Sequence, residues 1–357
     1  MSYSIDILNK IRENADTDYQ ARVPEATRDN IEAVGRAITD YELTYNTFCT
    51  ALIHKIGLTI IQTTLFTNKF APFKTGKVLT GQDVEEIFVH AFRQAEGSYD
   101  AEGGMGENGI NPFKRRDYQA VEVMYHRMNR RDKYVITLYK DDVIRAFRSE
   151  STLSSFITAQ FNSLYSGASY DEYVHMKELF AEAIAKGDFK TYLVPEIAEG
   201  STDAALQKAC KSFVRTVKKA IADASYPNTE LSPAGREKGL KTSVDKSNLA
   251  LFVHKDIQPH LDVDLYSLIF GPNYAQLGVT IVELDNFGKD NNGTYALLTD
   301  KDWFKIYDVK NEMTQLHNPE GLYTNYWLHI WQILSYSRFK TAIRFGTKDI
   351  TPSDTGA

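Results

Sequence analysis

A stretch of roughly 75 residues in the N-terminal half places the strongest constraint on how this chain can fold. Residues 67–140 show little helical periodicity and contain short alternating apolar segments. GQDVEEIFVHAF (81–92) predicts one strand, and QAVEVMYHRM and KYVITLY (119–128 and 133–139) predict two antiparallel strands joined by NRRD as the turn. Such a strip is too thin to own a core. The region therefore predicts a projecting two-stranded arm that needs a partner surface.

The charges of this region are segregated along the chain. Residues 83–107 carry seven acids and one base, and residues 114–148 carry ten bases and five acids. The glycine-rich stretch EGGMGENG (102–109) predicts a loop tip. Two interpretations stay open: solvated strand faces, or complementary charges between copies of the chain that steer association and fix its register. In the second interpretation the predicted subunit-interface residues are Glu85, Glu86, Glu102, Arg115, Arg116, Arg130 and Arg131.

Composition sets the broad class. The 357 residues are enough for about two domains, and 43% hydrophobic with 25% charged residues is ordinary for a globular chain. The net charge of -6 argues against a dedicated nucleic-acid binder, although it is compatible with a protein that merely contains DNA. No apolar run approaches the roughly 18 residues that cross a bilayer, and the start has no signal-peptide pattern. Cys49 and Cys210 are expected to be core thiols.

Helical patterns flank the arm on both sides. A short helix is predicted around Ile5 to Ile11, and a longer one carries its apolar stripe from Ile31 to Leu52 and ends at Gly57. Residues 58–66 predict a strand. Residues 149–187 predict a long helix that is kinked or broken near Gly167, where Ser169 and Glu172 form a capping-box pattern.

The following residues, about 200–310, predict a compact α+β unit. A helix over 202–222 has an apolar side and a basic face, and short strands with one short helix (262–271) follow it. The basic face has two interpretations: a solvated helix surface, or a surface near packaged DNA or an acidic partner. Residues 321–345 predict an amphipathic helix with a strand-like end, whose aromatic residues are expected in the core. The residues of the basic face are Lys208, Lys211, Arg215, Lys218 and Lys219. The aromatic residues are Tyr323, Tyr326, Trp327, Trp331, Tyr336 and Phe339.

No pattern for catalysis, metal or cofactor binding stands out. EGGMGENG lacks the Gly-Lys-Ser/Thr ending of a phosphate loop. The acidic and histidine cluster at 254–264 lacks the spacing of a zinc hydrolase, and residues 285–293 lack the alternating acids of a calcium loop. No Gly-x-Ser-x-Gly elbow is present. The prediction is therefore a protein that is not an enzyme and has no catalytic, metal or cofactor site.

Within residues 299–340, many residues that match a known family lie close together. TDKDWFKIYDVKNEMTQLHNPEGLYTNYWLHIWQILSYSRFK is very similar to the corresponding stretch of the major capsid proteins of phi-29-like podophages, the picovirus type. The resemblance continues upstream and covers nearly the whole chain. The residues that carry it include Asp300-Lys301-Asp302-Trp303-Phe304, Asn318-Pro319, Gly321-Leu322-Tyr323, Trp331-Gln332, Ser337-Arg338-Phe339, Ala33-Val34-Gly35, Glu85-Glu86-Ile87 and Leu261-Asp262-Val263-Asp264.

This resemblance implies an α+β chain with the Hong Kong 97-type phage capsid fold. The implied order is an N-terminal arm (1–57), a strand and extended loop (58–140), a peripheral domain with a long spine helix (141–195), an axial domain (196–310), and a return to the peripheral domain with a C-terminal tail (311–357). The phi-29 protein continues into an immunoglobulin-like domain, whereas this sequence ends with TPSDTGA. We therefore carry over no expectation from that domain.

The implied function is that of a major capsid protein, a structural protein of the virion that self-assembles into an icosahedral or prolate head around double-stranded DNA. The implied partners are copies of itself in pentamers and hexamers, a scaffolding protein and portal during assembly in the host cytoplasm, and packaged DNA contacted without sequence specificity, with no membrane. The basic face at 202–222 would be its DNA-facing surface. Two other classes stay open: another virion component such as a scaffold or connector, or a soluble enzyme whose site the sequence does not reveal.

Overall fold

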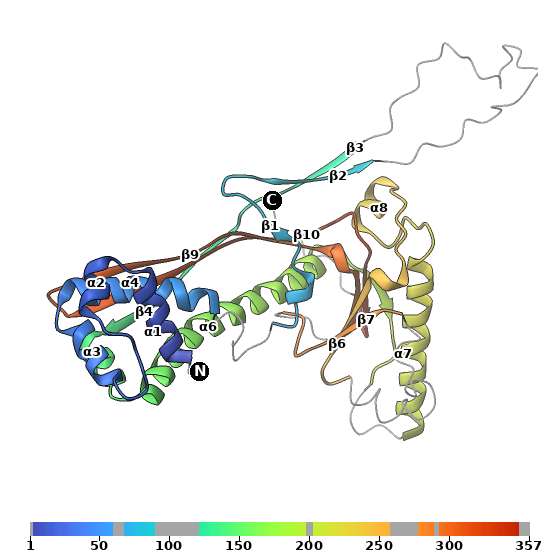
Figure 1. Cartoon of the computed structure of the whole chain (residues 1–357). Coiled ribbons are helices and arrows are strands. Elements are labelled where there is room, and N and C mark those ends of the chain that lie inside the picture. Colours follow the sequence, from blue (N-terminus) through green and yellow to red (C-terminus); the bar gives the residue numbers. More distant parts are fainter. Residues whose placement is uncertain are drawn as a thin grey trace, which may run out of the picture. The chain divides into compact units, whose positions relative to one another are not determined.

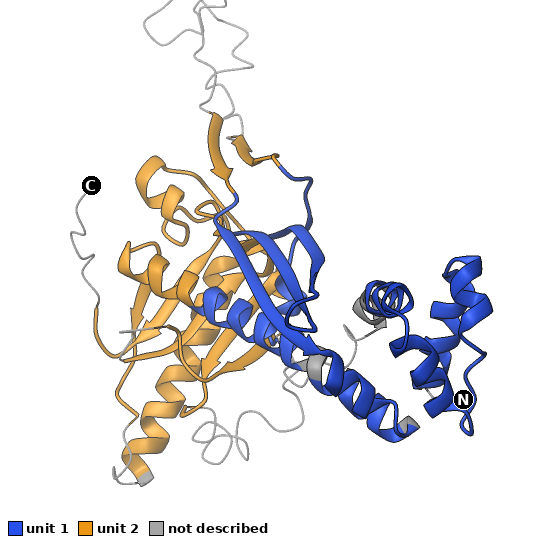
Figure 2. Cartoon of the chain, turned by 90° about the vertical axis from the view of Figure 1, so that its left-hand side faces the viewer, with its two compact units in different colours: residues 1–80, 128–177, 306–334 blue, residues 81–127, 178–305, 335–357 orange. Residues whose placement is uncertain are grey.

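The computed structural model describes residues 3–59, 68–89, 121–197, 203–257, 278–288 and 293–349. The chain divides into two compact units, coloured separately in Figure 2. Unit 1 comprises residues 1–80, 128–177 and 306–334, and unit 2 comprises residues 81–127, 178–305 and 335–357. Because each unit combines three stretches that are distant in the sequence, neither is a continuous segment of the chain.

Unit 1 begins with four helices that share one core. They are α1 (Tyr3–Asn14), α2 (Thr17–Arg22), α3 (Ile31–Thr39) and α4 (Glu42–Thr59). Their buried apolar side chains pack together with those of α5 (Lys140–Ala146) and of Tyr326. The short helix predicted around Ile5 to Ile11 is confirmed as α1, and Ile11 is fully buried in this core.

The longer N-terminal helix differs from the prediction in two ways. It is divided into α3 and α4, and Tyr41, which lies between them and was expected on the buried stripe, is 45% exposed. The buried stripe resumes at Tyr45. The helix also does not end at Gly57: α4 continues to Thr59, where a strand was expected to have begun. The rest of that predicted strand lies outside the described residues.

Unit 1 also contains a four-stranded sheet with the order β1-β9-β10-β4. Its strands are β1 (Gly76–Lys77), β9 (Phe304–Asn318), β10 (Tyr323–Tyr336) and β4 (Arg130–Tyr139). The prediction of an amphipathic helix at 321–345 is wrong: β10 is a strand paired with β4 over ten residues, and the strand-like end is β11 (Ala342–Gly346).

Local sequence explains why β10 is extended. Thr324, Tyr326 and Leu328 are buried while the residues between them are partly exposed, which is the period-two pattern of a strand. The turn before β10 is fixed by Asn318, whose side-chain oxygen accepts hydrogen bonds from the backbone N–H groups of Glu320 and Gly321. The segment is apolar at most positions, so a helical stripe fits it equally well and periodicity alone could not decide.

The projecting arm consists of a two-stranded antiparallel ribbon, and its strands are not both the predicted ones. β2 (Val84–Val89) pairs with β3 (Val121–His126), whereas β4 belongs to the sheet of unit 1. The predicted hairpin turn at 129–132 is therefore wrong. Asn129 instead directs the chain toward β10, because its side chain donates to the carbonyl of Leu334 and accepts from the N–H of the same residue, both at 2.8 Å.

The long helix is continuous. α6 runs over Glu150–Ala185 without a break, so the predicted interruption at Gly167 is wrong. A helix-interior glycine costs only about 1 kcal/mol. Here the neighbouring Leu164 and Ala168 are buried against Leu328, which offsets that cost. The helix is followed by Gly187 at φ 73°, a left-handed conformation that glycine adopts readily.

Unit 2 is built on a five-stranded sheet with the order β5-β11-β8-β6-β7. Figure 1 labels its strands β6 and β7 together with α7. The strands predicted at 249–256, 278–284 and 295–300 are confirmed as β6 (Leu249–His254), β7 (Thr280–Leu284) and β8 (Thr294–Asp300). β5 (Lys190–Leu193) pairs parallel to β11. α7 (Asp203–Ala224) packs its apolar side on this sheet, and α8 (Pro233–Lys238) lies in the connection that follows. The short helix predicted at 262–271 lies outside the described residues.

An aromatic stack forms a second centre of packing in unit 2. Trp303 is fully buried, with Phe180 stacked on its ring at 5.1 Å and Tyr336 at 4.9 Å between centroids. The expectation that the C-terminal aromatic block lies in the core holds for Tyr326, Tyr336 and Phe339. It does not hold for the rest of the block, because Tyr323, Trp327 and Trp331 are only partly buried.

Two helical glycines of unit 1, Gly35 in α3 and Gly167 in α6, offer a matched test of how the helices of this unit pack. A Cβ added at Gly35 would lie 2.4 Å from the Cβ of Phe147, whereas one added at Gly167 has nothing within 4 Å. We expect Gly35→Ala to lower the free energy of unfolding by about 1–3 kcal/mol through overpacking. We expect Gly167→Ala to raise it by about 0.5–1 kcal/mol. Urea denaturation followed by circular dichroism measures both, and equal effects of the two substitutions would contradict this account.

Candidate functional site

The arm ribbon, defined as β2 and β3, has two chemically different faces. Residues alternate between them along each strand, and cross-strand partners share a face. The inner face carries Glu86, Phe88, Glu122, Met124 and His126, all buried or partly buried. The outer face carries Glu85, Ile87, Val89, Val121, Val123 and Tyr125, all exposed. The ribbon is therefore fixed on one side and open on the other.

Apolar contacts and an ion pair attach the inner face to the rest of unit 2. The ring of Phe88 stacks on that of Phe339 at 5.6 Å between centroids. Phe88 and Met124 both pack against the small cluster of Ala234, Leu240 and Phe339. Glu122 adds an ion pair to Lys238 of α8. These contacts hold both strands against α8, Leu240 and the turn that follows β10.

A buried polar cluster adds a second attachment. His126 is fully buried, and its ring nitrogens lie 2.8 Å from Ser335 Oγ and 3.2 Å from Glu86 Oε2. Glu86 also accepts from Ser337 and lies 3.3 Å from Lys305 Nζ. Burial alone would raise the pKa of Glu86, but the hydrogen bond from His126, the charge of Lys305 and the Ser337 hydroxyl together lower it below its usual value. Glu86 is thus an ionised group satisfied within its own subunit.

The outer face is an apolar stripe that no described residue covers. Ile87 pairs with Val123 and Val89 with Val121, and these four side chains are 40–61% exposed. Tyr125 is 58% exposed and its hydroxyl donates to Glu85. A contiguous exposed apolar stripe of this kind is typical of an interaction surface. Sequence reasoning missed these residues, although the apolar residues at consecutive positions of both strands signalled a ribbon with two apolar faces.

Arg130, predicted at a subunit interface, lies inside unit 1. It is 4% exposed and donates to Gln332 at 2.7 Å, to Tyr134 at 2.9 Å and to Asp132 at 2.6 Å. Tyr134 in turn donates to Asp171 of α6 at 2.7 Å. Although burial opposes its charge, the hydrogen bonds and negative neighbours raise the pKa of Arg130 overall. These contacts give Arg130 a structural role within its own chain, unlike the role predicted for it.

The other predicted interface residues fall into two groups. Glu85 and Arg131 are exposed, and Arg131 lies 5.3 Å from the ring centre of Trp331. Glu102, Arg115 and Arg116 lie outside the described residues. The charge interpretation of the arm therefore rests, among residues that the structure describes, on Glu85 and Arg131.

The basic face of α7 has the predicted geometry. Lys208, Lys211, Arg215, Lys218 and Lys219 are all exposed, while Cys210, Phe213 and Val217 between them are buried. No acidic residue occurs between positions 204 and 222. The helix therefore presents one sign of charge along its exposed side.

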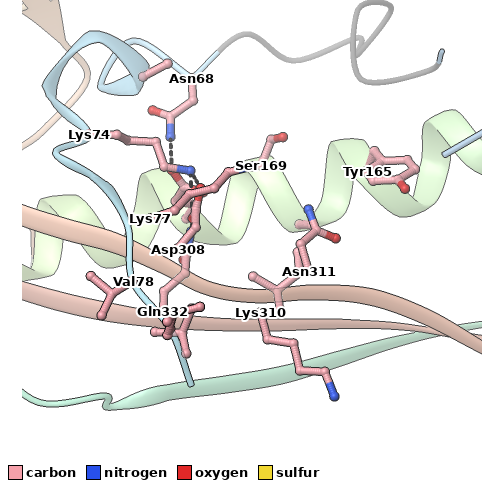
Figure 3. Close-up of a pocket in the computed structure, with 16 residues that line it drawn as sticks. Asn68, Lys74, Lys77, Val78, Tyr165, Ser169, Asp308, Lys310, Asn311 and Gln332 are labelled. Carbon is pink, nitrogen blue, oxygen red and sulfur yellow. Dashed lines mark hydrogen bonds and ion pairs between the residues drawn. The ribbon is translucent and has the colours of Figure 1, made fainter. Parts of the chain in front are cut away.

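Unit 1 contains a cavity of about 710 Å³ beside α6 (Figure 3). Lys74 Nζ lies 3.1 Å from both Glu172 Oε2 and Asp308 Oδ1, and Gln332 donates to the same two oxygens. Both carboxylates therefore already have partners, which is the arrangement of a structural ion-pair cluster rather than of a general base directed at a substrate.

Metal and membrane sites can also be assessed over the described ranges. Within them, no three histidine, cysteine or acidic side chains lie close enough together to hold a metal ion. In the same part of the chain, no helix combines the length and the apolar character of a membrane span.

Comparisons with known proteins identify the family. A family model described as Phi29-like phage major capsid protein matches residues 8–346. The major capsid protein of Bacillus phage B103 is 32% identical over 99% of this chain and 75% of its own length. The chain belongs to the Phi29-like phage major capsid protein family. The major capsid protein of Streptococcus phage Cp-1 is 26% identical over 94% of this chain and 92% of its own length.

Solved structures give the same fold for this capsid protein. A chain from the capsid structure of Staphylococcus phage Andhra aligns with a TM-score of 0.59 at 13% identity, over 79% of this chain and 85% of its own. A chain from a bacteriophage P68 structure of head fiber and inner core protein aligns with a TM-score of 0.61 at 11% identity, over 80% and 87%. The Hong Kong 97-type capsid fold is thereby confirmed.

Family membership settles what the protein does at the level of the virion. It is a major capsid protein, a structural component of the phage head that associates with itself into a shell, and its family is not an enzyme family. The candidate functional sites are therefore surfaces for other subunits rather than a catalytic cleft.

The burial of Arg130 changes what its substitution should do. We expect Arg130→Met to lower the free energy of unfolding of the subunit by about 3 kcal/mol, because the buried Gln332 loses a charged donor and the partly exposed Asp132 loses its ion-pair partner. Arg131→Met, on the exposed neighbouring position, should change it by less than about 0.5 kcal/mol. Urea denaturation of the two variants is the measurement, and equal stability of both would contradict the structural role of Arg130.

Proposed function

We propose that the arm ribbon is the element by which one capsid subunit holds the next. The observation that carries this proposal is the exposed apolar outer face, whose five large side chains lie on a ribbon already attached by its other face. An exposed apolar stripe adds nothing to the stability of a single subunit, whereas its burial against a neighbour contributes a favourable free energy of association of about 25 cal/mol per Å² of apolar area. The neighbour is another copy, because the capsid protein assembles with itself.

A contact of this type supports rings. We propose that a neighbour covers the outer face with a different part of its own surface, so that the contact joins two unlike patches. Unlike patches generate closed rings when the rotation between copies closes. We propose on this basis that subunits form the pentamers and hexamers expected for a shell of this fold.

We assign the parts of the fold by the same analogy. α6 would be the spine helix of the peripheral domain, and the sheet of unit 2 with α7 would be the axial domain that lies nearest the symmetry axes. A scaffolding protein and a portal are the further partners that family membership implies during assembly in the host cytoplasm.

We further propose that the basic face of α7 lines the DNA-containing interior. Five exposed cations on one helix, with no intervening acid, suit a phosphate backbone that is contacted without base recognition.

The ribbon proposal is tested by polar substitution on its outer face. We expect Ile87→Ser combined with Val123→Ser to leave a folded subunit that does not assemble, because both side chains are exposed in the single chain. Electron microscopy measures shells, and thermal unfolding confirms the fold. Tyr226→Ser, which removes a 72% exposed aromatic residue elsewhere in unit 2, is the matched control and should assemble normally. Normal shells from the double variant would refute the proposal.

The interior assignment is tested through salt dependence. Lys211→Glu with Arg215→Glu should weaken DNA binding by assembled protein and reduce the slope of log binding constant against log salt by about 2–4, since two cations become anions. Lys246→Glu with Lys255→Glu, also two exposed lysines of unit 2, is the control. Equal slopes for both pairs of substitutions would refute the assignment of α7 to the DNA-facing surface.

A further inference from the structure

The arm ribbon is attached at two places, and they differ in how strictly they fix its direction. Where Phe88 and Met124 pack against Phe339, the contact is apolar. Attraction between apolar surfaces is not directional, and a cavity of about 280 Å³ lies beside Met124 and Phe339. This attachment stabilises the ribbon against the rest of unit 2, but it is compatible with a range of angles.

The second attachment is polar, buried and directional. The side chain of His126 is fully buried, its Nε2 lies 3.2 Å from Glu86 Oε2, and its Nδ1 lies 2.8 Å from Ser335 Oγ. Because a carboxylate only accepts hydrogen bonds, Nε2 carries the hydrogen of the pair with Glu86. An imidazole ring with one fixed partner on each nitrogen has a single orientation.

Glu86 connects this ring to residues outside the ribbon. Its Oε1 accepts a hydrogen bond from Ser337 at 2.9 Å and lies 3.3 Å from Nζ of Lys305, whose side chain is 14% exposed. One residue from each strand of the ribbon is therefore bound to residues of β9, of β10 and of the turn that follows β10. We call this group the base cluster, and it consists of Glu86, His126, Lys305, Ser335 and Ser337.

A cluster of this kind contributes more to geometry than to stability. Removing charged groups from water costs about as much free energy as their mutual contacts return, so an apolar replacement of similar volume is often equally stable. A satisfied buried network nevertheless fits in one arrangement, because any other leaves a buried donor or acceptor without a partner. The ion pair of Arg127 with Asp83 on the same ribbon cannot impose such a restraint, since its side chains are 75% and 49% exposed.

We propose that the base cluster sets the direction in which the arm ribbon projects, and that Glu86 and His126 are positioning residues for shell assembly. The proposal rests on the assembly role of the arm ribbon and adds what that role requires of the free subunit. An interface bears the cost of ordering any flexible part at the moment of contact. A ribbon whose direction is fixed in advance avoids this cost and presents its exposed apolar side chains in one place.

Spin-label distances measure the direction of the ribbon in the disassembled subunit. Labels are attached at Val123→Cys on the outer face and at Tyr226→Cys elsewhere in unit 2, because both positions are exposed and the two native cysteines are buried. The test variant combines Glu86→Met, His126→Phe and Lys305→Met, which makes the base cluster apolar at similar volume. Double electron–electron resonance should give a distance distribution at least about twice as broad as that of the labelled chain without these three substitutions.

Two controls separate direction from attachment strength. Asp83→Ser with Arg127→Ser removes charges from the same ribbon without changing the base cluster, so the distance distribution should stay narrow and shells should form normally. Phe88→Leu removes the ring that stacks on Phe339, so the thermal unfolding midpoint should fall while the distribution stays narrow. A broad distribution in the Phe88→Leu chain would show that attachment strength alone fixes the ribbon, which would overturn the proposal.

Shell assembly without labels completes the test. The triple variant should keep its thermal unfolding midpoint but form shells in about a tenth of the normal yield or less. A narrow distance distribution in this variant would refute the role of the base cluster in direction, and a broad distribution with normal shells would refute its role in assembly.

A milder substitution keeps the test decisive if the triple variant does not fold. Glu86→Gln keeps the volume of the side chain but removes the charge that Lys305 and His126 share, so its distance distribution should be broader than that of the Asp83→Ser/Arg127→Ser chain. Equal widths for these two chains would overturn the proposal. Normal assembly of the Ile87→Ser/Val123→Ser chain would instead refute the ribbon proposal, and it would leave the distance measurements unaffected.

Discussion

The attachment of the arm ribbon by one face is the constraint on which the rest of the surface depends. Two strands alone cannot bury both of their sides, so each inner residue must find a partner in unit 2. Phe88 stacks on Phe339, and Glu86 accepts a hydrogen bond from Ser337 and pairs with Lys305. Because these contacts use every second residue, the remaining side chains face outward as a set. The exposure of the outer stripe is thus a consequence of how firmly the inner one is held.

The same alternation separates structure from recognition on the sheet of unit 1. Arg130 and Arg131 are adjacent in sequence and identical in chemistry, yet one is 4% exposed within a polar network and the other is exposed beside a tryptophan. Strand periodicity alone produces this difference. A charged residue on a strand can therefore be assigned to an interface only when the side on which it lies is known.

The sequence predicted those elements whose patterns are local and unambiguous. α1, α7 and the strands β6, β7 and β8 follow from a clear stripe or alternation, and the exposure of the α7 basic face follows with them. β10 was misassigned because its apolar residues satisfy both periods. The partner of β4 was misassigned because strand pairing depends on contacts distant in sequence: Asn129 binds Leu334, about 200 positions away. The exposure of the outer face of the ribbon could not be predicted for the same reason, since it depends on which distant residues cover the inner face. Resemblance to a family supplied the function, which periodicity could not.

The interleaving of the two units has a consequence for synthesis of the chain. The polypeptide passes between them after residues 80, 127, 177, 305 and 334, so each unit draws on early and late residues alike. Strand β10, which completes the sheet of unit 1, leaves the ribosome almost last, and β11 of unit 2 follows it. An incomplete nascent polypeptide therefore lacks a finished body of either kind, and prematurely terminated products are expected to be cleared by proteolysis before they can enter a growing particle.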